Sequence, residues 1–131
     1  MKLFKYTDDL FPMYEDWTTK HGMFCPSGIL PPDGWIVMKD RKPLVMGWTY
    51  LAQGIGCYWF AWITTNPDNT TFESYRAIRF MLRKVADALV KVDYNVCFSM
   101  SASNGLTKLF EREGFTQNHQ ATQVFKQWER Q

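Results

Sequence analysis

The chain has 131 residues, of which 46% are hydrophobic and 17% aromatic, which suits the core of one domain and excludes a disordered chain. Fifteen basic and thirteen acidic residues leave a formal net charge of +2, too close to neutral for the clustered positive charge of a nucleic-acid-binding surface. The longest apolar run, Cys57 to Ile63, is far shorter than the roughly 20 residues that a membrane-spanning helix needs.

The cysteines and histidines argue against a disulfide framework and against a metal site. Cys25, Cys57 and Cys97 are odd in number and widely spaced, with no CxxC pair among them. Neither His21 nor His119 has a second ligand at metal-binding spacing. Residues 1–6 lack the apolar run and the cleavage site of a secretory signal. We therefore expect reduced thiols, no metal, no membrane segment and a cytoplasmic location.

A short β-type run over residues 3–6 precedes a helix over roughly 8–20. Thr7 is placed to cap this helix, and Asp8 and Asp9 fall in its first turn, where the helix dipole favours negative charge. Pro12 is tolerated near the first turn, where a missing N–H costs little. Four apolar residues at helical spacing should face the core: Leu10, Phe11, Tyr14 and Trp17.

Residues 21–34 are expected to form a loop, because two glycines precede the pair Pro31-Pro32 and then Asp33-Gly34. A loop of this length in a compact domain favours a functional role. The alternative, that it merely crosses the edge of the sheet, stays open.

Three strand-like runs follow, over residues 35–38, 44–52 and 57–64, and the last is dense in aromatic and β-branched side chains, as a central strand should be. The connections between them are too short for crossovers, so the runs predict an antiparallel meander. The second connection, Gln53-Gly54-Ile55-Gly56, superficially resembles a phosphate-binding turn. Because a strand and not a helix follows it, we assign it to a hairpin.

The best-defined element is a helix over about 71–92, which begins with a capping box formed by Thr70 and Glu73. Its apolar stripe consists of Tyr75, Ile78, Leu82, Val85 and Leu89, and its polar side of Arg76, Arg79, Arg83 and Asp87. A buried strand over 95–100 should come next. A short helix capped by Ser103 or Asn104 and stopped by Gly114, then a last strand over 122–128, complete the chain.

The predicted order is β-α-βββ-α-β-α-β, with one parallel strand pair inside a mainly antiparallel sheet. This is an α+β fold with helices packed on a mixed sheet, and we expect it to form a single domain over residues 1–131.

The order of elements resembles the GNAT (GCN5-related) N-acetyltransferase fold over essentially the whole chain. The sharpest local match is the segment from Asn104 to Phe115, NGLTKLFEREGF, which is similar to the family's late helix with its Asn, its Leu-Tyr-Glu-Lys-type stretch and its Gly-Phe end. An N-capped helix with a glycine stop would give the same local pattern without the family relationship.

The resemblance implies acetyl-CoA as cofactor and transfer of its acetyl group to an amine. Family members hold the cofactor's pyrophosphate in a glycine-containing turn before the long helix, which here falls at residues 66–71 and contains no glycine. Pro67 supplies no N–H, and Asp68 and Glu73 bring negative charge to the place of an anion. The cofactor-binding residues that the resemblance implies are Ile63, Thr64, Thr65, Asn69, Thr70, Thr71, Arg76, Asn104 and Phe110.

The catalytic residues cannot be assigned from the resemblance. Phe110 stands where the family usually has the tyrosine that protonates the departing thiolate, and the strand 57–65 contains no Asp, Glu or His to serve as base. Other side chains could substitute, although ordinary packing or solvation explains each of them as well: Tyr58, Tyr75, Tyr94 and His119.

Two functions follow. The first is an acetyl-CoA-dependent N-acetyltransferase acting on an unidentified amine. The second is a catalytically degenerate protein of the same fold with a binding or structural role, similar to the small internal virion or virion-associated proteins of tailed phages, located in the host cytoplasm or the virion. A third idea, stacking of single-stranded nucleic acid on Trp59, Phe60 and Trp62, lacks a basic groove, so no nucleic-acid partner is expected.

Overall fold

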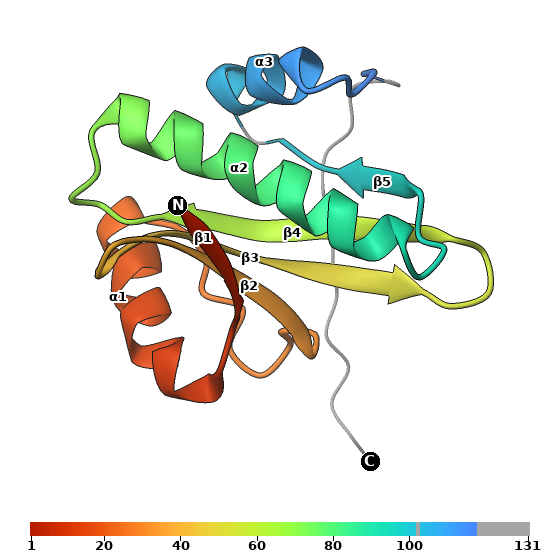
Figure 1. The fold of residues 1–131 in the computed structure, drawn as a ribbon. Coiled ribbons are helices and arrows are strands. Elements are labelled where there is room, and N and C mark those ends of the chain that lie inside the picture. The colour runs from red at the N-terminus through yellow and green to blue at the C-terminus, as the bar shows by residue number, and fades with distance from the viewer. Residues whose placement is uncertain (102, 118–131) are drawn as a thin grey trace. The chain divides into compact units, whose positions relative to one another are not determined.

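The computed structural model describes residues 1–101 and 103–117, and the chain divides after Ser101 into two compact units. In the first unit, five strands form one sheet in the order β1-β2-β3-β4-β5 (Figure 1). Their bounds are β1 Lys2–Lys5, β2 Asp33–Lys39, β3 Lys42–Ala52, β4 Cys57–Thr65 and β5 Val96–Ser99. Neighbouring strands are antiparallel except β4 and β5, which are parallel. The predicted α+β fold, with its mixed and mainly antiparallel sheet, is confirmed.

The first helix begins later than predicted. Residues Asp8–Leu10 form a 3-10 turn, η1, and the α-helix α1 spans Phe11–His21. The prediction that Thr7 caps a helix was wrong, because its hydroxyl donates to the Asp9 carboxylate and accepts no backbone N–H. Pro12 does fall in the first turn of α1, as expected, and Gly22 ends the helix with a φ of 65°.

The helix α2, Thr71–Val90, begins with the predicted capping box and ends two residues before the predicted Val92. Figure 1 shows α1 and α2 on opposite faces of the sheet. On the α1 face, a cluster of large buried side chains consists of Tyr14, Trp17, Ile36, Met46 and Trp48. On the other face, α2 buries Ala77, Ile78, Met81, Leu82, Val85 and Leu89. The core is therefore two layers of side chains, one on each face.

The turn between β3 and β4 forms the hairpin that the sequence predicted. The turn between β3 and β4 contains Gly54 and Gly56 at φ values of 84° and 67°, which glycine adopts without strain. Since this turn joins two paired strands, its assignment to a hairpin is confirmed.

The fifth strand is less buried than its apolar sequence indicates. Val96 and Phe98 are each nearly half exposed, so the prediction of a buried strand was wrong on this face. Phe98 stacks on Trp59 of β4, with ring centroids 4.8 Å apart. No helix within residues 1–101 or 103–117 is long and apolar enough to cross a membrane.

The second unit contains α3, Asn104–Arg112. The Ser103 hydroxyl accepts the Leu106 N–H at 3.2 Å, so Ser103 is the cap. Gly114 follows the helix with a φ of 92°, and the rings of Phe110 and Phe115 are 4.9 Å apart. The predicted strand over 122–128 and His119 lie outside the described residues.

Candidate functional site

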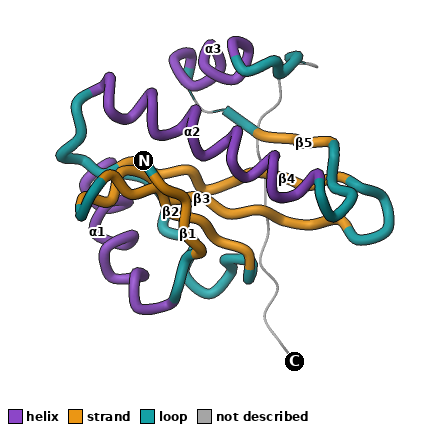
Figure 2. Tube along the Cα trace, viewed as in Figure 1, coloured by secondary structure: helices purple, strands orange, loops and turns teal. Residues whose placement is uncertain are grey.

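Strand β4 is longer than its parallel neighbour β5, which ends opposite the middle of β4. The two strands pair from Cys57 with Val96 to Phe60 with Ser99. The Ser99 hydroxyl closes this ladder by donating to the Phe60 carbonyl at 2.9 Å. Beyond that point β4 continues to Thr65 without a β5 partner (Figure 2). Residues 61–65, which we call the unpaired segment, therefore present a strand edge to whatever binds beside them.

A β-bulge lies inside the unpaired segment. On its other side β4 pairs with β3, and there Trp62 and Ile63 both stand opposite the single residue Gly47. Trp62 has a φ of 60°, a left-handed conformation that is unfavourable for a bulky side chain. Such strain persists only where surrounding contacts impose it, and it is concentrated at functional sites.

Gly47 makes room for the bulge. A Cβ at this position would lie 2.6 Å from the Phe60 ring and 3.1 Å from the Met81 methyl group, with Ile63 also in contact. Phe60, Ile63 and Met81 therefore converge on the glycine from the α2 side. Trp62 instead packs on the α1-side core, so Trp62 and Ile63 lie on opposite faces of the sheet.

Two side-chain hydrogen bonds and a ring contact hold Trp62 in place. Its indole N–H donates to the Tyr50 hydroxyl at 2.7 Å, and its carbonyl accepts from the Tyr14 hydroxyl at 3.3 Å. Tyr50 in turn donates to the carbonyl of Ile29 at 3.3 Å. The Phe24 ring also lies 6.1 Å from the Trp62 ring. The loop between α1 and β2 is thus tied directly to the bulge, while its functional role stays a prediction.

The three residues predicted to face the cofactor arm share the unpaired segment. Ile63 points toward α2, and the buried Thr64 hydroxyl donates to the Trp62 carbonyl at 3.2 Å. The Thr65 carbonyl accepts from Nε2 of His21 at 2.8 Å. Sequence reasoning missed His21 at this place, because it is 44 residues from Thr65 in the chain and no local pattern connects them. A histidine whose Nε2 carries the proton has a free lone pair on Nδ1 and can accept a proton there.

The N-terminus of α2 is closed by its own side chains. The Thr70 N–H donates to the Glu73 carboxylate at 2.9 Å, and the Glu73 N–H donates to the Thr70 hydroxyl at 3.1 Å. The preceding turn is also satisfied internally, because the N–H groups of Asp68 and Asn69 bond to Asn66 at 2.9 and 3.0 Å. An incoming phosphate therefore meets few available N–H donors at this helix end.

Charge at this end is balanced within the chain. The Lys42 ammonium lies 3.3 Å from both carboxylate oxygens of Glu73. The Thr70 backbone hydrogen bond, followed by the Lys42 interaction, lowers the pKa of Glu73 below its usual value. The carboxylate therefore stays negative at neutral pH, at the place where the resemblance puts a pyrophosphate.

The remaining residues of the predicted phosphate turn differ in their availability. The Asn69 amide donates inward, to the Leu44 carbonyl at 2.8 Å and the Ser74 hydroxyl at 3.1 Å. Thr70 is used by the capping box, whereas Thr71 is exposed at the first position of α2. Arg76 is exposed one turn further on, with its guanidinium 5.6 Å from the Phe72 ring centroid. Thr71 and Arg76 are therefore the members of this predicted set that are exposed and take no part in the capping box.

Asn104 and Phe110 belong to the second unit, and their predicted contact with a cofactor stays a prediction. Asn104 is exposed at the start of α3, and Phe110 is buried against Phe115. No hydroxyl is available at position 110 to protonate a thiolate.

The surroundings of Tyr58, one of the side chains that could replace the missing tyrosine as proton donor, keep its hydroxyl protonated. Burial, followed by interaction with Cys97, raises the pKa of the Tyr58 hydroxyl. Burial likewise raises the pKa of the Cys97 thiol to about 11, so this thiol is neutral at physiological pH. Both groups lie on the paired half of the β4–β5 ladder, where Tyr58 stands opposite Cys97. This agrees with the interpretation of Cys97 as an unreactive thiol.

The aromatic residues of β4 do not form a common stacking platform. Trp59 is exposed, whereas the neighbouring Phe60 is buried on the opposite, α2-facing side of the sheet. Trp62 is occupied by its contacts with Tyr50 and Phe24. Within residues 1–101 and 103–117, no group of three or more His, Cys, Asp or Glu side chains could hold a metal ion.

Neither a protein-family model nor a curated protein sequence matches the chain. Solved structures do match it. A mutant of TTHA1254 from Thermus thermophilus superposes with a TM-score of 0.72 at 13% identity, covering 99% of this chain and 100% of that one. Rv2747 from Mycobacterium tuberculosis, in complex with CoA and NLQ, has a TM-score of 0.67 at 14% identity, covering 95% of this chain and 76% of that one.

An enzyme with a stated activity is also similar. The aminoglycoside antibiotic 6'-N-acetyltransferase AAC(6')-IG from Acinetobacter haemolyticus has a TM-score of 0.61 at 12% identity, covering 98% of this chain and 100% of that one. These similarities, with the strand order and the two faces described above, show that the chain has the GNAT fold.

Proposed function

We propose that the chain is an acetyl-CoA-dependent N-acetyltransferase that acts on an amine. The observation that carries this proposal is the unpaired segment of β4, which begins where β5 ends and contains the strained bulge at Trp62. Similarity to AAC(6')-IG and to the CoA complex of Rv2747 supports it at the level of the fold.

The pantetheine arm of the cofactor fits the chain better than the pyrophosphate does. An extended pantetheine arm carries amide groups that suit a strand edge, and residues 61–65 provide one. The pyrophosphate fits poorly, since the Glu73 carboxylate occupies the helix end and the turn 66–71 has no glycine. Thr71 and Arg76 are the residues best placed to compensate. We therefore expect CoA to bind mainly through its arm.

When bound, acetyl-CoA would supply the thioester whose acetyl group is transferred. The chain would contribute positioning along the unpaired segment, and backbone N–H groups near the bulge to stabilise negative charge on the acyl oxygen. His21, held at Thr65 through Nε2, would accept the proton of the amine on Nδ1 or through a water molecule. In this scheme no side chain of the described residues takes the role of the family's tyrosine, so solvent would supply the proton of the departing thiol.

The alternative is a binding or structural role on a degenerate GNAT fold, such as that of a phage virion-associated protein. Two observations favour it: the self-closed N-terminus of α2, and the exposed apolar side chains of Trp59, Val96 and Phe98. Loss of the family's acid and phosphate turn would follow naturally from loss of catalysis.

Calorimetric titration with acetyl-CoA, CoA and acetyl-pantetheine separates these functions. Micromolar binding of acetyl-CoA, with acetyl-pantetheine binding nearly as well, would support the enzyme and locate the affinity in the arm. Absence of binding at millimolar concentrations of all three compounds would reject the enzyme in favour of the binding role.

Acetyl transfer itself is measured by release of free CoA thiol in the presence of a panel of amines. The variant His21→Gln should lower kcat by roughly 10²-fold or more with little change in the affinity for acetyl-CoA. Unchanged kcat in this variant would exclude His21 as the proton acceptor. The wild-type protein assayed without amine gives the background rate of thioester hydrolysis.

A further inference from the structure

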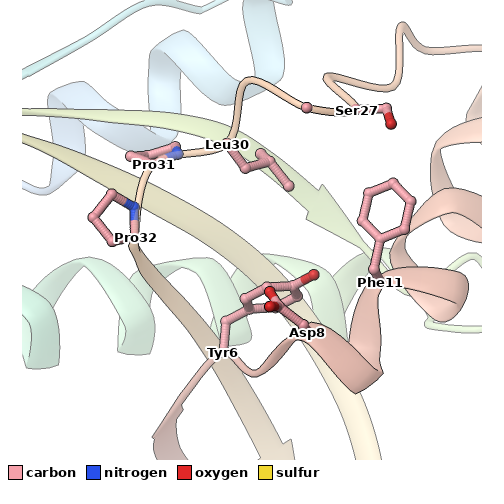
Figure 3. A pocket seen from close by; sticks show the side chains of 8 residues that line it. Tyr6, Asp8, Phe11, Ser27, Leu30, Pro31 and Pro32 are labelled. Carbon is pink, nitrogen blue, oxygen red and sulfur yellow. The ribbon is translucent and has the colours of Figure 1, made fainter.

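A pocket of about 540 Å³ lies on the α1 face, between the start of the first helical region and the loop that precedes β2. Figure 3 shows it between the start of the first helical region, with Tyr6, Asp8 and Phe11, and the loop that carries Ser27, Leu30, Pro31 and Pro32. Its volume is within the range of small-molecule sites, roughly 300–1,000 Å³. None of the residues described above as candidates for acetyl transfer lines it.

The chain builds this pocket from firmly held elements. Tyr6 is fixed by its N–H, which donates to the Gly34 carbonyl at 2.8 Å, and by its ring, which packs edge-on against Trp48 at 4.9 Å. Phe11 packs toward Tyr14 at 6.4 Å. The opposite wall is stiffened by two consecutive prolines and held by the Tyr50–Ile29 hydrogen bond. The pocket is therefore largely formed before any ligand arrives.

The residues that line the pocket carry negative charge and no positive charge. Among the eight residues that line it, Asp8 is charged and none is basic. The Asp8 carboxylate has no hydrogen-bond or ion-pair partner within the described part of the chain, and Asp9 adds a second negative charge beside it. The nearest basic residue in sequence, Lys5, does not line the pocket, and its ammonium lies 3.8 Å above the Trp35 ring and 3.7 Å from Asp33.

Burial, followed by the charges of Asp8 and Asp9, raises the pKa of Tyr6, so its hydroxyl stays neutral. The pocket thus combines a free carboxylate and two aromatic rings with an apolar wall of Leu30 and the prolines. A carboxylate and aromatic faces attract a cation together, while an anion would meet repulsion and find no basic group.

We propose that this pocket binds an organic ammonium ion, whose charged group lies between Asp8 and the Tyr6 and Phe11 rings and whose apolar body rests on Leu30 and the prolines. The inference does not depend on acetyl transfer, because binding is measured without acetyl-CoA.

The test compares phenylbutylamine with the neutral phenylbutanol by calorimetry, at low and near-physiological salt. The amine should bind roughly tenfold more tightly than the alcohol, and its advantage should shrink as salt is added. Equal affinities of the two compounds, or no heat from the amine at millimolar concentration, would overturn the proposal.

Variants locate the site. Asp8→Asn should remove most of the amine's advantage, and Phe11→Leu should reduce it about threefold by removing an aromatic face. Glu15→Gln is the matched control, since it removes an exposed carboxylate from α1 with the same change in net charge. An equal loss in Asp8→Asn and Glu15→Gln would show a general charge effect and reject the pocket. Thermal unfolding of each variant confirms that it is folded.

Discussion

The Glu73 carboxylate accepts the Thr70 N–H at 2.9 Å and lies 3.3 Å from the Lys42 ammonium. One side chain therefore both caps α2 and balances the positive charge of Lys42 at the start of β3. This places a carboxylate that is negative at neutral pH where the resemblance to the GNAT family puts the pyrophosphate of CoA. The relationship between these residues leads to the first two predictions.

Glu73→Gln should strengthen binding of CoA by roughly threefold to tenfold, because it removes the repelling charge and keeps an oxygen that can accept the Thr70 N–H. Calorimetry of CoA binding measures the effect. Asp87→Asn is the control, since Asp87 is an exposed carboxylate far along the same helix. Identical affinities in the two variants would show that no anion docks at this helix end.

Acid should remove the contribution of Glu73 to stability. Its pKa is lowered in the folded chain, so its contribution is fully present above the ordinary pKa of glutamate and is lost as the pH falls through the folded value. Urea unfolding between pH 7 and about pH 3 should therefore show wild type losing its advantage over Glu73→Gln. A difference that is constant across this range would contradict the assignment.

Gly47→Ala should destabilise the protein by about 1–3 kcal/mol, because the new methyl group would lie 2.6 Å from the rigid Phe60 ring. Gly105→Ala is the contrasting variant. Its Cβ would meet nothing within 4 Å, and replacing a helical glycine should stabilise α3 by up to about 1 kcal/mol. Chemical denaturation measures both. Equal small effects would mean that the bulge relaxes freely around position 47.

Tyr50→Phe should loosen the loop between α1 and β2 and the bulge at the same time, because one hydroxyl bonds both Trp62 and Ile29. The expected loss of stability is about 1–2 kcal/mol, and amide exchange in residues 23–30 should become faster. Tyr94→Phe serves as the control for removing a tyrosine hydroxyl elsewhere. Unchanged exchange in the loop would show that the prolines alone hold it.

The Cys97 thiol should resist alkylation in the folded protein. Burial raises its pKa to about 11, so it is almost entirely protonated at pH 7 and becomes reactive only as the pH approaches that value. Peptide mass mapping after treatment with iodoacetamide, native and unfolded, gives the rates. Rapid native modification of Cys97 at neutral pH would contradict the raised pKa of this partly buried thiol.

Elements with local signals were predictable from the sequence. The Thr70–Glu73 capping box, the Gly54–Gly56 hairpin and the Gly114 stop each depend on residues that are close in the chain. Because their physics is local, the residue types are enough to indicate them. The antiparallel order of β2, β3 and β4 followed from the short turns, which leave no room for crossovers.

The candidate site was harder to predict, since its geometry depends on distant contacts. The bulge at Trp62 has no local signature, because one extra residue in a strand of aromatic side chains leaves the composition unchanged. The hydrogen bond between His21 and Thr65 joins residues that only the folded sheet brings together. The exposure of Val96 and Phe98 likewise depends on which element covers their face and not on their own hydrophobicity.

The N-terminus of α2, which is capped by residues of the same chain, also affects how folding depends on ligands. A helix end that must be completed by a ligand couples folding to ligand supply, so that the folded fraction follows the ligand concentration. Here Thr70, Glu73 and Lys42 complete that end within the chain. Folding of this helix end is therefore independent of the supply of any ligand.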